Sequence, residues 1–200
     1  MKVVLADYGA GNLRSLSSAL RRVGADPVVS REPTEVEHAP LTLIAGVGHV
    51  ASASAGLARD GLDEAIRSRV SAGRPVAGIC VGMQLLFGAS EEGGGGLELL
   101  AGPVKRLRAR VVPHMGWNTL VESRPNELLD GLEGEDVYFA HSFGAEPLDP
   151  TVTVATVDHD GSIVAAVEAG PLVGVQFHPE RSGAAGSRVL ENLVRWSRNA

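Results

Sequence analysis

The sequence predicts an α/β fold, in which a mostly parallel central sheet is flanked by helices and extended by appended antiparallel strands. In the first half, short apolar runs alternate with amphipathic runs of helical period, the pattern of a parallel sheet covered on both faces. From residue 104 onward, the apolar runs are short and separated by turns, which is typical of antiparallel strands. No linker or internal repeat divides the chain, so residues 1–200 are expected to form one domain.

The elements of the first half are predicted from apolar spacing and from start and stop signals. Asn12 is an expected N-cap and Gly24 an expected stop for the helix between them. Acidic residues early in 62–73 and arginines later suit the helix dipole. Strands are expected at 2–6, 26–30, 41–46 and 75–80, and helices at 13–24, at 62–73 and from 82 onward.

The second half contains six strand-like runs and one final helix. Residues 157–162 and 168–171 have the composition of hairpin connections, and 91–96 that of a flexible loop. The strands are expected at 104–107, 119–122, 137–143, 151–157, 162–168 and 172–177, and the helix at 186–199.

Composition limits the class of protein. A formal net charge of −6 argues against nucleic acid as the main partner, since phosphate binding needs a basic face. A single cysteine excludes an intrachain disulfide and fits a reducing compartment. Residues 39–58 lack charged side chains except for a histidine, but small-residue turns make them a poor membrane span. We therefore expect a cytoplasmic protein with no membrane segment.

Cys80, the only cysteine, lies in the stretch Gly78-Ile79-Cys80-Val81-Gly82, between a predicted strand and a predicted helix. This G-x-C-x-G spacing is the pattern of a nucleophile elbow, with cysteine in place of serine. The sharp turn projects the sulfur from the sheet edge, where the helix dipole stabilises the thiolate. The Val81 N–H then points at the oxyanion formed by attack on a carbonyl carbon. A lone cysteine is otherwise most often a packed core residue, so the nucleophile hypothesis needs a base.

His178 is the best candidate for that base. It directly follows the apolar run 172–177, so it lies at the end of a predicted strand, on the same sheet edge as Cys80. Glu180 can accept a hydrogen bond from one ring nitrogen and leave the other facing the sulfur. Taken alone, His-Pro-Glu reads as a loop with a solvated acid, but with the upstream cysteine it completes a Cys-His-Glu triad. The histidines assigned to loops or turns are His38, His49 and His159.

Motifs along nearly the whole chain resemble the class I (triad) glutamine amidotransferases. The G-x-C-x-G-x-Q and H-P-E motifs are shared widely among these enzymes. DYGAGN at 7–12 and PHMGWN at 113–118 are more discriminating, and they resemble the glutaminase subunits of imidazole glycerol phosphate synthase, in histidine biosynthesis. The resemblance implies a class I amidotransferase fold of flavodoxin-like type. Further matching stretches are 46–48, 78–87, 96–107, 138–143 and 174–183.

The resemblance assigns roles to the triad. It implies that Cys80 attacks the side-chain amide of L-glutamine and that His178 protonates the leaving ammonia and activates the hydrolytic water. Glu180 orients His178. The resemblance also implies that the glycine-rich loop 46–48 must rearrange on partner binding before it completes the oxyanion hole. Losing one such donor costs on the order of 10²–10³ in rate, so a partner that restores it acts as a switch.

Further site residues are implied by the same resemblance. The N–H groups of the oxyanion hole come from Val81, Val47 and Gly48. The glutamine pocket is formed by Gly46, Gln84, His141, Ser142 and Phe143. No metal and no cofactor are implied.

The implied partner is the cyclase subunit of the synthase, in a heterodimer. Its docking face includes Asn12, Met115, Gly116 and Trp117. Ammonia passes to that subunit, which adds it to a phosphoribulosyl-formimino imidazole carboxamide ribotide, giving imidazole glycerol phosphate and aminoimidazole carboxamide ribotide. Without the resemblance, Asn12 reads equally well as a helix cap and Trp117 as a core cap.

Two positions depart from the family pattern. Ala45 stands where proline is usual, which loosens the oxyanion strand, and Phe143 stands where tyrosine is common, which removes one hydroxyl from the pocket wall. Neither position belongs to the triad. Two alternatives stay open: a sister glutaminase that serves pyridoxal phosphate or anthranilate synthesis, and a non-catalytic interaction protein on the same scaffold.

Overall fold

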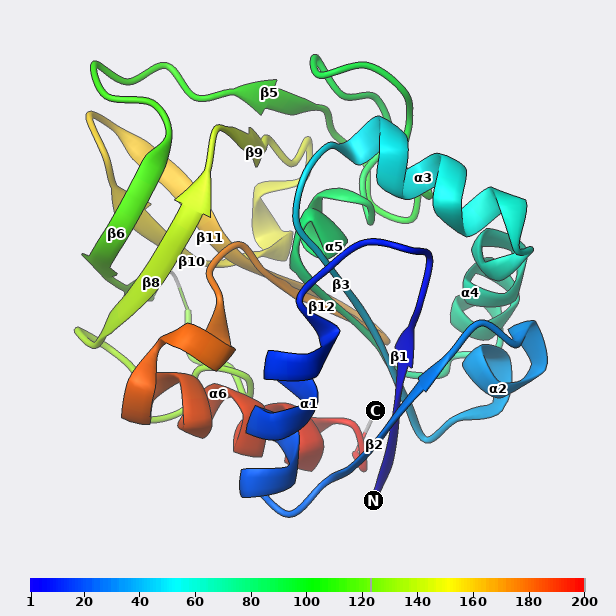
Figure 1. Ribbon diagram of the computed structural model, residues 1–200. Helices are drawn as coiled ribbons and strands as arrows, with labels where there is room; N and C mark the ends of the chain where they lie inside the picture. The colour runs from blue at the N-terminus through cyan, green and yellow to red at the C-terminus, as the bar shows by residue number, and fades with distance from the viewer. Residues whose placement is uncertain (123, 200) are drawn as a thin grey trace.

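The computed structural model describes residues 1–122 and 124–199, and a mixed eight-stranded sheet runs through their centre (Figure 1). Five neighbouring strands are parallel, and the three beyond them alternate in direction. The predicted fold class is confirmed. In sheet order the strands are β2 (Asp26–Ser30), β1 (Lys2–Ala6), β3 (Leu41–Gly46), β4 (Val76–Cys80), β12 (Leu172–Val175), β11 (Ser162–Ala169), β10 (Thr153–Asp158) and β7 (Val121–Glu122).

Polar and apolar residues do not alternate along the central strands, because both faces of these strands are covered. Every residue of β3, β4 and β12 is buried. Such continuous apolar runs are what a parallel sheet between two helical layers requires. Because β12 pairs in parallel with β4, with Val175 opposite Ile79, the segments that follow the two strands emerge at the same edge.

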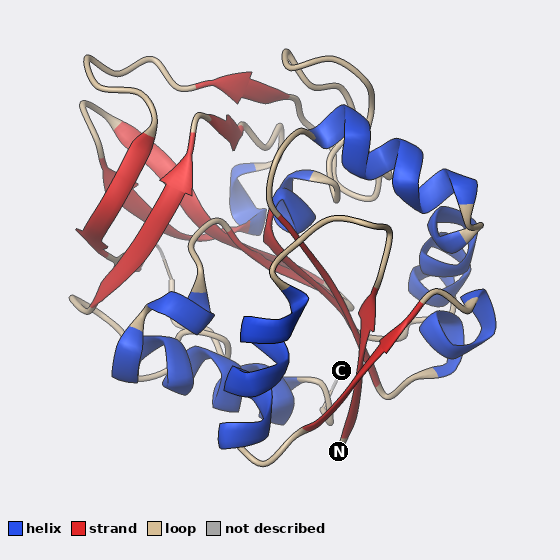
Figure 2. Cartoon of the chain, in the orientation of Figure 1, coloured by secondary structure: helices blue, strands red, loops and turns tan. Residues whose placement is uncertain are grey.

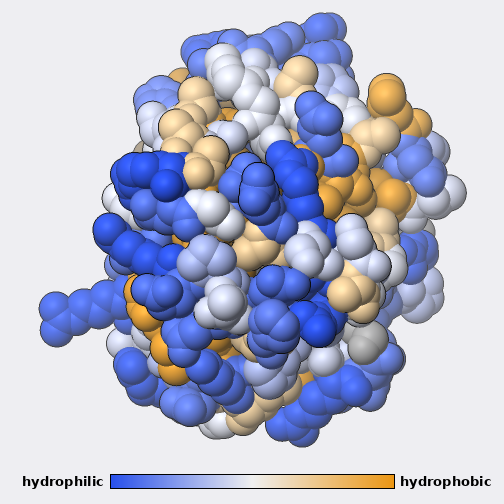
Figure 3. All heavy atoms as spheres, turned by 90° about the vertical axis from the view of Figure 1, so that its right-hand side faces the viewer, coloured by the Kyte–Doolittle hydropathy of each residue, from blue (hydrophilic) through white to orange (hydrophobic). Residues whose placement is uncertain are grey.

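Helices lie on both sides of this sheet (Figure 2). Helices α1 (Leu13–Arg22) and α6 (Gly183–Trp196) lie together on one side, and α2 (Pro33–His38), α3 (Val50–Arg59) and α4 (Leu62–Ser71) lie on the other (Figure 1). On the face that carries α2, α3 and α4, hydrophilic side chains predominate, with small apolar spots among them (Figure 3). Among the described residues, no helix is long and apolar enough to cross a membrane.

Two helices were not predicted, and each has a physical reason. Helix α2 has only six residues, too few to show a helical period, and it contains His38, which was wrongly assigned to a loop. Helix α3 consists mostly of alanine, serine and glycine, which give a weak amphipathic signal. These small residues permit close packing: a Cβ at Gly56 would lie 2.4 Å from the Tyr8 carbonyl oxygen.

Several predicted boundaries move. Helix α1 begins after Asn12, but the Asn12 side chain makes no capping hydrogen bond, while Gly24 follows the helix end with φ +77° as a stop signal should. Helix α5 (Val81–Gln84) has only four residues, far fewer than the amphipathic run that predicted it. Helix α6 starts at Gly183, three residues before the predicted start, after a 3-10 helix at Pro179–Arg181.

The second half also forms two small antiparallel sheets, one pairing β5 with β9 and the other pairing β6 with β8. The predicted strand 137–143 is interrupted at Ser142, and the predicted strand 119–122 is divided between β6 and β7. A 3-10 helix at Pro150–Val152 precedes β10. Both predicted hairpin connections are present, between β10 and β11 and between β11 and β12. The bounds are β5 (Val104–Arg106), β6 (His114–Thr119), β8 (Asp136–His141) and β9 (Phe143–Ala145).

Arg69 is a fully buried cation within helix α4. Its guanidinium donates to the carbonyl oxygens of Pro75, at 2.8 Å, Val36, at 3.1 Å, and Glu37, at 3.0 Å. Burial lowers the pKa of Arg69 to about 10, with a smaller contribution from the charge of Arg74, so the group stays protonated at neutral pH. Arg69 therefore ties α2 and the start of β4 to α4, although its sequence context indicated a surface helix.

We expect Arg69→Met to lower the free energy of unfolding by about 3 kcal/mol, because it removes three hydrogen bonds that a buried charged group donates between elements. Urea denaturation measures the change. Arg14→Met is the control, because Arg14 lies at an exposed position of α1, and it should change the free energy of unfolding by less than about 0.5 kcal/mol. Equal effects of the two substitutions would contradict a stabilising role for the buried guanidinium.

Candidate active site

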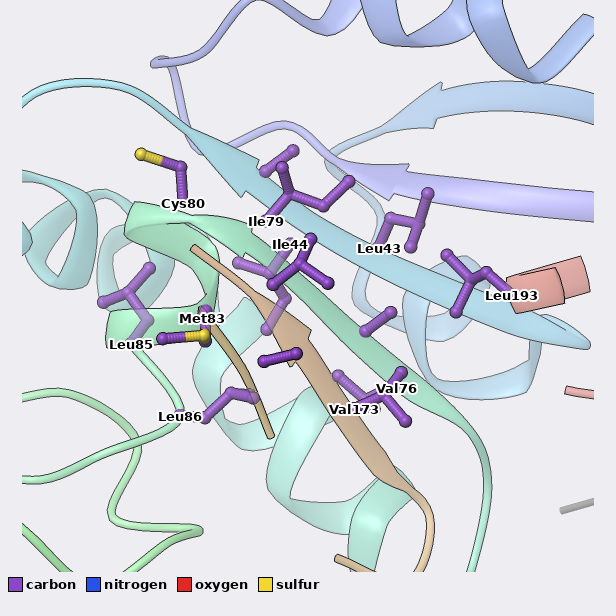
Figure 4. Packing of buried hydrophobic residues seen from close by; sticks show 14 of the residues in the cluster. Leu43, Ile44, Val76, Ile79, Cys80, Met83, Leu85, Leu86, Val173 and Leu193 are labelled. Atoms are coloured by element: carbon purple, nitrogen blue, oxygen red, sulfur yellow. The ribbon is translucent and has the colours of Figure 1, made fainter. Parts of the chain in front are cut away.

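Cys80 stands at a strained turn between β4 and α5. Its backbone adopts φ 55° and ψ −112°, a conformation that residues other than glycine rarely adopt. The turn folds back so closely that a Cβ at Gly78 would lie 2.5 Å from the Gly82 carbonyl oxygen, and one at Gly82 would lie 1.7 Å from that of Ile44. The two glycines of the motif are therefore steric requirements. The Cys80 side chain points away from the packed core around Ile44 and Met83 (Figure 4).

His178 lies three residues beyond the end of β12, at the sheet edge where β4 ends at Cys80. Its backbone N–H donates to the Tyr138 carbonyl at 2.8 Å, and the Ser182 hydroxyl donates to the His178 carbonyl at 2.7 Å. The Tyr138 N–H in turn donates to Ser182 Oγ at 2.9 Å. Strand β8 and the start of α6 thus fix the backbone of His178 on both sides.

The three predicted triad residues come together at this edge. His178 Nδ1 lies 3.0 Å from Glu180 Oε1, and both side chains are about 5% exposed. Burial opposes protonation of the ring, but the hydrogen bonds to Cys80 and Glu180 and their negative charges outweigh it and raise the pKa of His178 to about 10. His178 is therefore protonated at neutral pH, as an imidazolium held between the side chains of Cys80 and Glu180.

A cavity of about 240 Å³ opens in front of Cys80. Seven residues predicted for the oxyanion hole or the glutamine pocket line it: Val47, Gly48, Val81, Gln84, His141, Ser142 and Phe143. Gly46 does not line it; a Cβ there would lie 1.8 Å from the Tyr8 hydroxyl, so this glycine makes room for the tyrosine. His49, Glu92, Pro113, Met115 and Ala140 complete the lining.

Comparison with known proteins shows the family to which the chain belongs. The family model described as glutamine amidotransferase class-I matches residues 4–196. The imidazole glycerol phosphate synthase subunit HisH of Moorella thermoacetica is 45% identical, covering 99% of this chain and 98% of that protein. The same subunit of Methanothermobacter thermautotrophicus is 43% identical, covering 96% and 97%. The chain belongs to the HisH family of class I glutamine amidotransferases.

Solved structures agree on the fold. A crystal structure of glutamine amidotransferase matches with a TM-score of 0.80 and 20% identity, covering 98% of both chains. The structure of PurLQS from Thermotoga maritima matches with a TM-score of 0.79 and 21% identity, also covering 98% of both chains. At this level of identity the likeness concerns the fold.

Tyr8 was not singled out from the sequence, although it lies in the DYGAGN motif. Its buried hydroxyl donates to the Ala45 carbonyl at 2.9 Å. Burial, together with the charge of Cys80, raises the pKa of Tyr8 well above its ordinary value, so the hydroxyl keeps its proton. Tyr8 thus pins the end of β3 just before the glycine-rich loop, at the position where the family proline is missing.

Gln176 is a second residue that the sequence did not reveal. It is fully buried, and its Nε2 donates to Cys80 Sγ at 3.7 Å while its Oε1 accepts from Gln84 Nε2 at 3.0 Å. Gln84 also donates to the Phe143 carbonyl at 2.7 Å. The available signal was a polar residue inside the apolar run 172–177.

The residues predicted for partner docking do not form one cluster. Met115 and Trp117, on strand β6, are 65% and 57% exposed, so Trp117 does not cap a core. Trp117 packs edge-on against Tyr138, with ring centroids 6.0 Å apart, and the Arg181 guanidinium lies 4.0 Å above the same ring. Asn12 instead lines a small cavity together with His178 and Glu180.

We expect Gly82→Ala to lower the free energy of unfolding by about 3 kcal/mol, because its Cβ would lie 1.7 Å from the Ile44 carbonyl oxygen. The matched control is Gly73→Ala, where φ is +71° but no atom lies within 4 Å, and which should cost about 1 kcal/mol. Thermal unfolding of both variants measures the two losses of stability. Because Gly82 itself has no positive φ, a loss no larger than that of Gly73→Ala would contradict the steric requirement.

Proposed function

We propose that the chain is the glutaminase subunit of imidazole glycerol phosphate synthase and hydrolyses L-glutamine to glutamate and ammonia. The observation that carries the proposal is the meeting of Cys80, His178 and Glu180 at one sheet edge beside a cavity. The family match over residues 4–196 supports one amidotransferase domain. The intact triad speaks against a non-catalytic protein on this scaffold.

The first half-reaction uses the charge arrangement of the triad. The Cys80 thiolate attacks the carbon of the side-chain amide, and the His178 imidazolium gives its proton to the departing nitrogen as the C–N bond breaks. Glu180 keeps His178 oriented and stabilises its positive charge. Glutamate stays bound to Cys80 as a thioester. His178, now neutral, then accepts a proton from water as the water oxygen attacks the thioester carbon. The C–S bond breaks, glutamate leaves, and Cys80 returns to the thiolate and His178 to the imidazolium.

The oxyanion of each tetrahedral intermediate needs N–H donors at the elbow. Val81 is the first residue of α5, so its N–H has no partner within that helix. Val47 and Gly48 line the same cavity, and Gly48 has φ +100° with no atom near its Cβ direction. We assign the oxyanion hole to Val81 and to this loop, whose conformation glycine leaves free to change.

Glu92 is a further candidate for substrate recognition. It is the one carboxylate among the described residues that line the cavity, and a bound amino acid carries an α-ammonium group that requires a counter-charge. Its side chain is 11% exposed; Oε1 lies 2.7 Å from His49 Nδ1 and Oε2 accepts from the Val50 N–H at 2.8 Å. Glu92 therefore has a fixed position at the mouth of the cavity.

The proposed partner is the cyclase subunit of the synthase, to which the ammonia passes. The names of the relatives, each a synthase subunit, support this partner over a pyridoxal phosphate or anthranilate synthase. We assign docking to strand β6, where Met115 and Trp117 are exposed and Gly116 between them is half-buried, and to the exposed Asn12. Met115 lines the cavity as well, so a partner on β6 would lie where ammonia is released. A chain with one cysteine fits the cytoplasm.

We expect glutamine hydrolysis to be weak for the chain alone and to rise by about 10²–10³ with the cyclase subunit and its nucleotide ligand. Glutamate release measures it. Cys80→Ala should abolish hydrolysis yet still form the complex, and that complex should make imidazole glycerol phosphate from an ammonium salt but not from glutamine. Glutamine hydrolysis that survives Cys80→Ala would overturn the assignment.

The pKa of His178, about 10, gives a separate prediction. Because the folded-state pKa lies above the unfolded value of about 6.5, this interaction stabilises the fold below pH 6.5, and the contribution is lost as the pH rises toward 10. In Cys80→Ala the hydrogen bond and the charge of the thiolate are missing, so the pKa of His178 should fall. Imidazole ¹⁵N shifts, titrated in both proteins, measure it, and identical titrations would contradict the thiolate–imidazolium pair.

A further inference from the structure

Two buried histidines face each other across strands β6 and β8. His114 and His141 are register partners, 3% and 6% exposed, and His114 Nδ1 lies 3.0 Å from His141 Nε2. His141 lines the cavity in front of Cys80, whereas His114 does not. Nothing in the proposed chemistry uses His114, so its burial beside a site residue requires a separate explanation.

The positions of the protons follow from the partners. His141 Nδ1 lies 2.8 Å from the Phe143 carbonyl oxygen, which can only accept, so Nδ1 carries the proton. Burial lowers the pKa of both rings to about 4, so both are neutral at neutral pH. His141 Nε2 then has a free lone pair, and the proton between the rings belongs to His114 Nδ1.

Asn118 fixes the other end of the pair. Its Oδ1 accepts from the Thr119 N–H at 2.8 Å, and its Nδ2 donates to the Asp158 carbonyl at 2.9 Å, which sets the orientation of the amide. The same Nδ2 lies 3.1 Å from His114 Nε2 and donates to it. Every donor therefore points the same way, from Asn118 through both rings to the Phe143 carbonyl.

The Phe143 carbonyl is where this chain of hydrogen bonds meets the pocket. It accepts from His141 on one side and from Gln84 Nε2, at 2.7 Å, on the other, which uses both of its lone pairs. Gln84 is bound to Gln176, which donates to the Cys80 sulfur. The orientation of this peptide group thus depends on which nitrogen of His141 carries its proton.

We propose that His114 is a positioning residue for the glutamine pocket: it holds His141 in the Nδ1–H tautomer, and so holds the Ser142–Phe143 wall against Gln84. The inference rests on the proposed glutaminase function. Ring packing alone does not require a histidine here. His114 stacks on Phe139 and His159, at centroid distances of 4.5 and 4.2 Å, and a phenylalanine ring could also stack there. Compared with a phenylalanine ring, the His114 imidazole adds an N–H donor that points at His141 Nε2.

A matched pair of variants separates the donor from the packing. His114→Asn and His114→Leu have similar shapes and both lose the ring, but only asparagine keeps an N–H donor where Nδ1 now lies. Kinetics are measured for the full chain with its synthase partner. We expect the KM for glutamine to rise about tenfold in His114→Leu with kcat changed less than about twofold, and to return to within about threefold of wild type in His114→Asn.

Imidazole ¹⁵N spectra of the full chain provide a readout independent of activity. In the wild type, His141 should show a proton on Nδ1, and His114→Leu should lose this signature while His114→Asn retains it. A wild-type His141 protonated on Nε2, or equal KM values for the two variants, would overturn the proposal. A wild-type protein that hydrolyses no glutamine with its partner would overturn the proposed function instead, while the spectra would still test the histidine pair.

Discussion

The site depends on the space that two glycines leave between β4 and β12. Gly78 and Gly174 are partners in the parallel register, and a Cβ at Gly174 would lie 2.5 Å from the Met83 side chain. The turn after Cys80 can therefore fold back over both strands, which brings α5 directly after Cys80 against them. The same pairing places His178 at the edge where Cys80 ends its strand. Strain at Cys80 is sustained because this packing surrounds the turn.

Burying an imidazolium at this edge is costly unless partners offset the lost solvation. His178 has Glu180 on Nδ1 and Cys80 as its second hydrogen-bond partner, and its backbone is bound to Tyr138 and Ser182. The charges come from three side chains, but the geometry comes from strand β8 and the start of α6. The precise position of His178 is thus a property of the tertiary fold, which the local H-P-E motif does not contain.

The sequence predicted the parallel strands, the elbow and the triad, since each has a local signal: an apolar run, two glycines around a cysteine, a histidine after a strand. It missed α3, whose small residues serve the contact between Gly56 and Tyr8. It also missed Gln176 and the His114–His141 pair, because both depend on which residues lie opposite each other across strands. Partners distant in the chain leave no periodic or spacing signal in a single sequence.

The two faces of strand β6 contact two different parts of the site, and its register with β8 determines both contacts. His114 and Trp117 are three residues apart and therefore point to opposite faces of the strand: His114 meets His141 inside, and Trp117 packs on Tyr138 outside. The first contact leads to the pocket wall at Phe143, and the second to the strand that binds the backbone of His178. A slip of one residue would exchange the two faces and break both connections. The pairing of β6 with β8 therefore fixes His178 and the wall at Phe143 relative to each other. Strand β6 is also the strand that we assign to the partner.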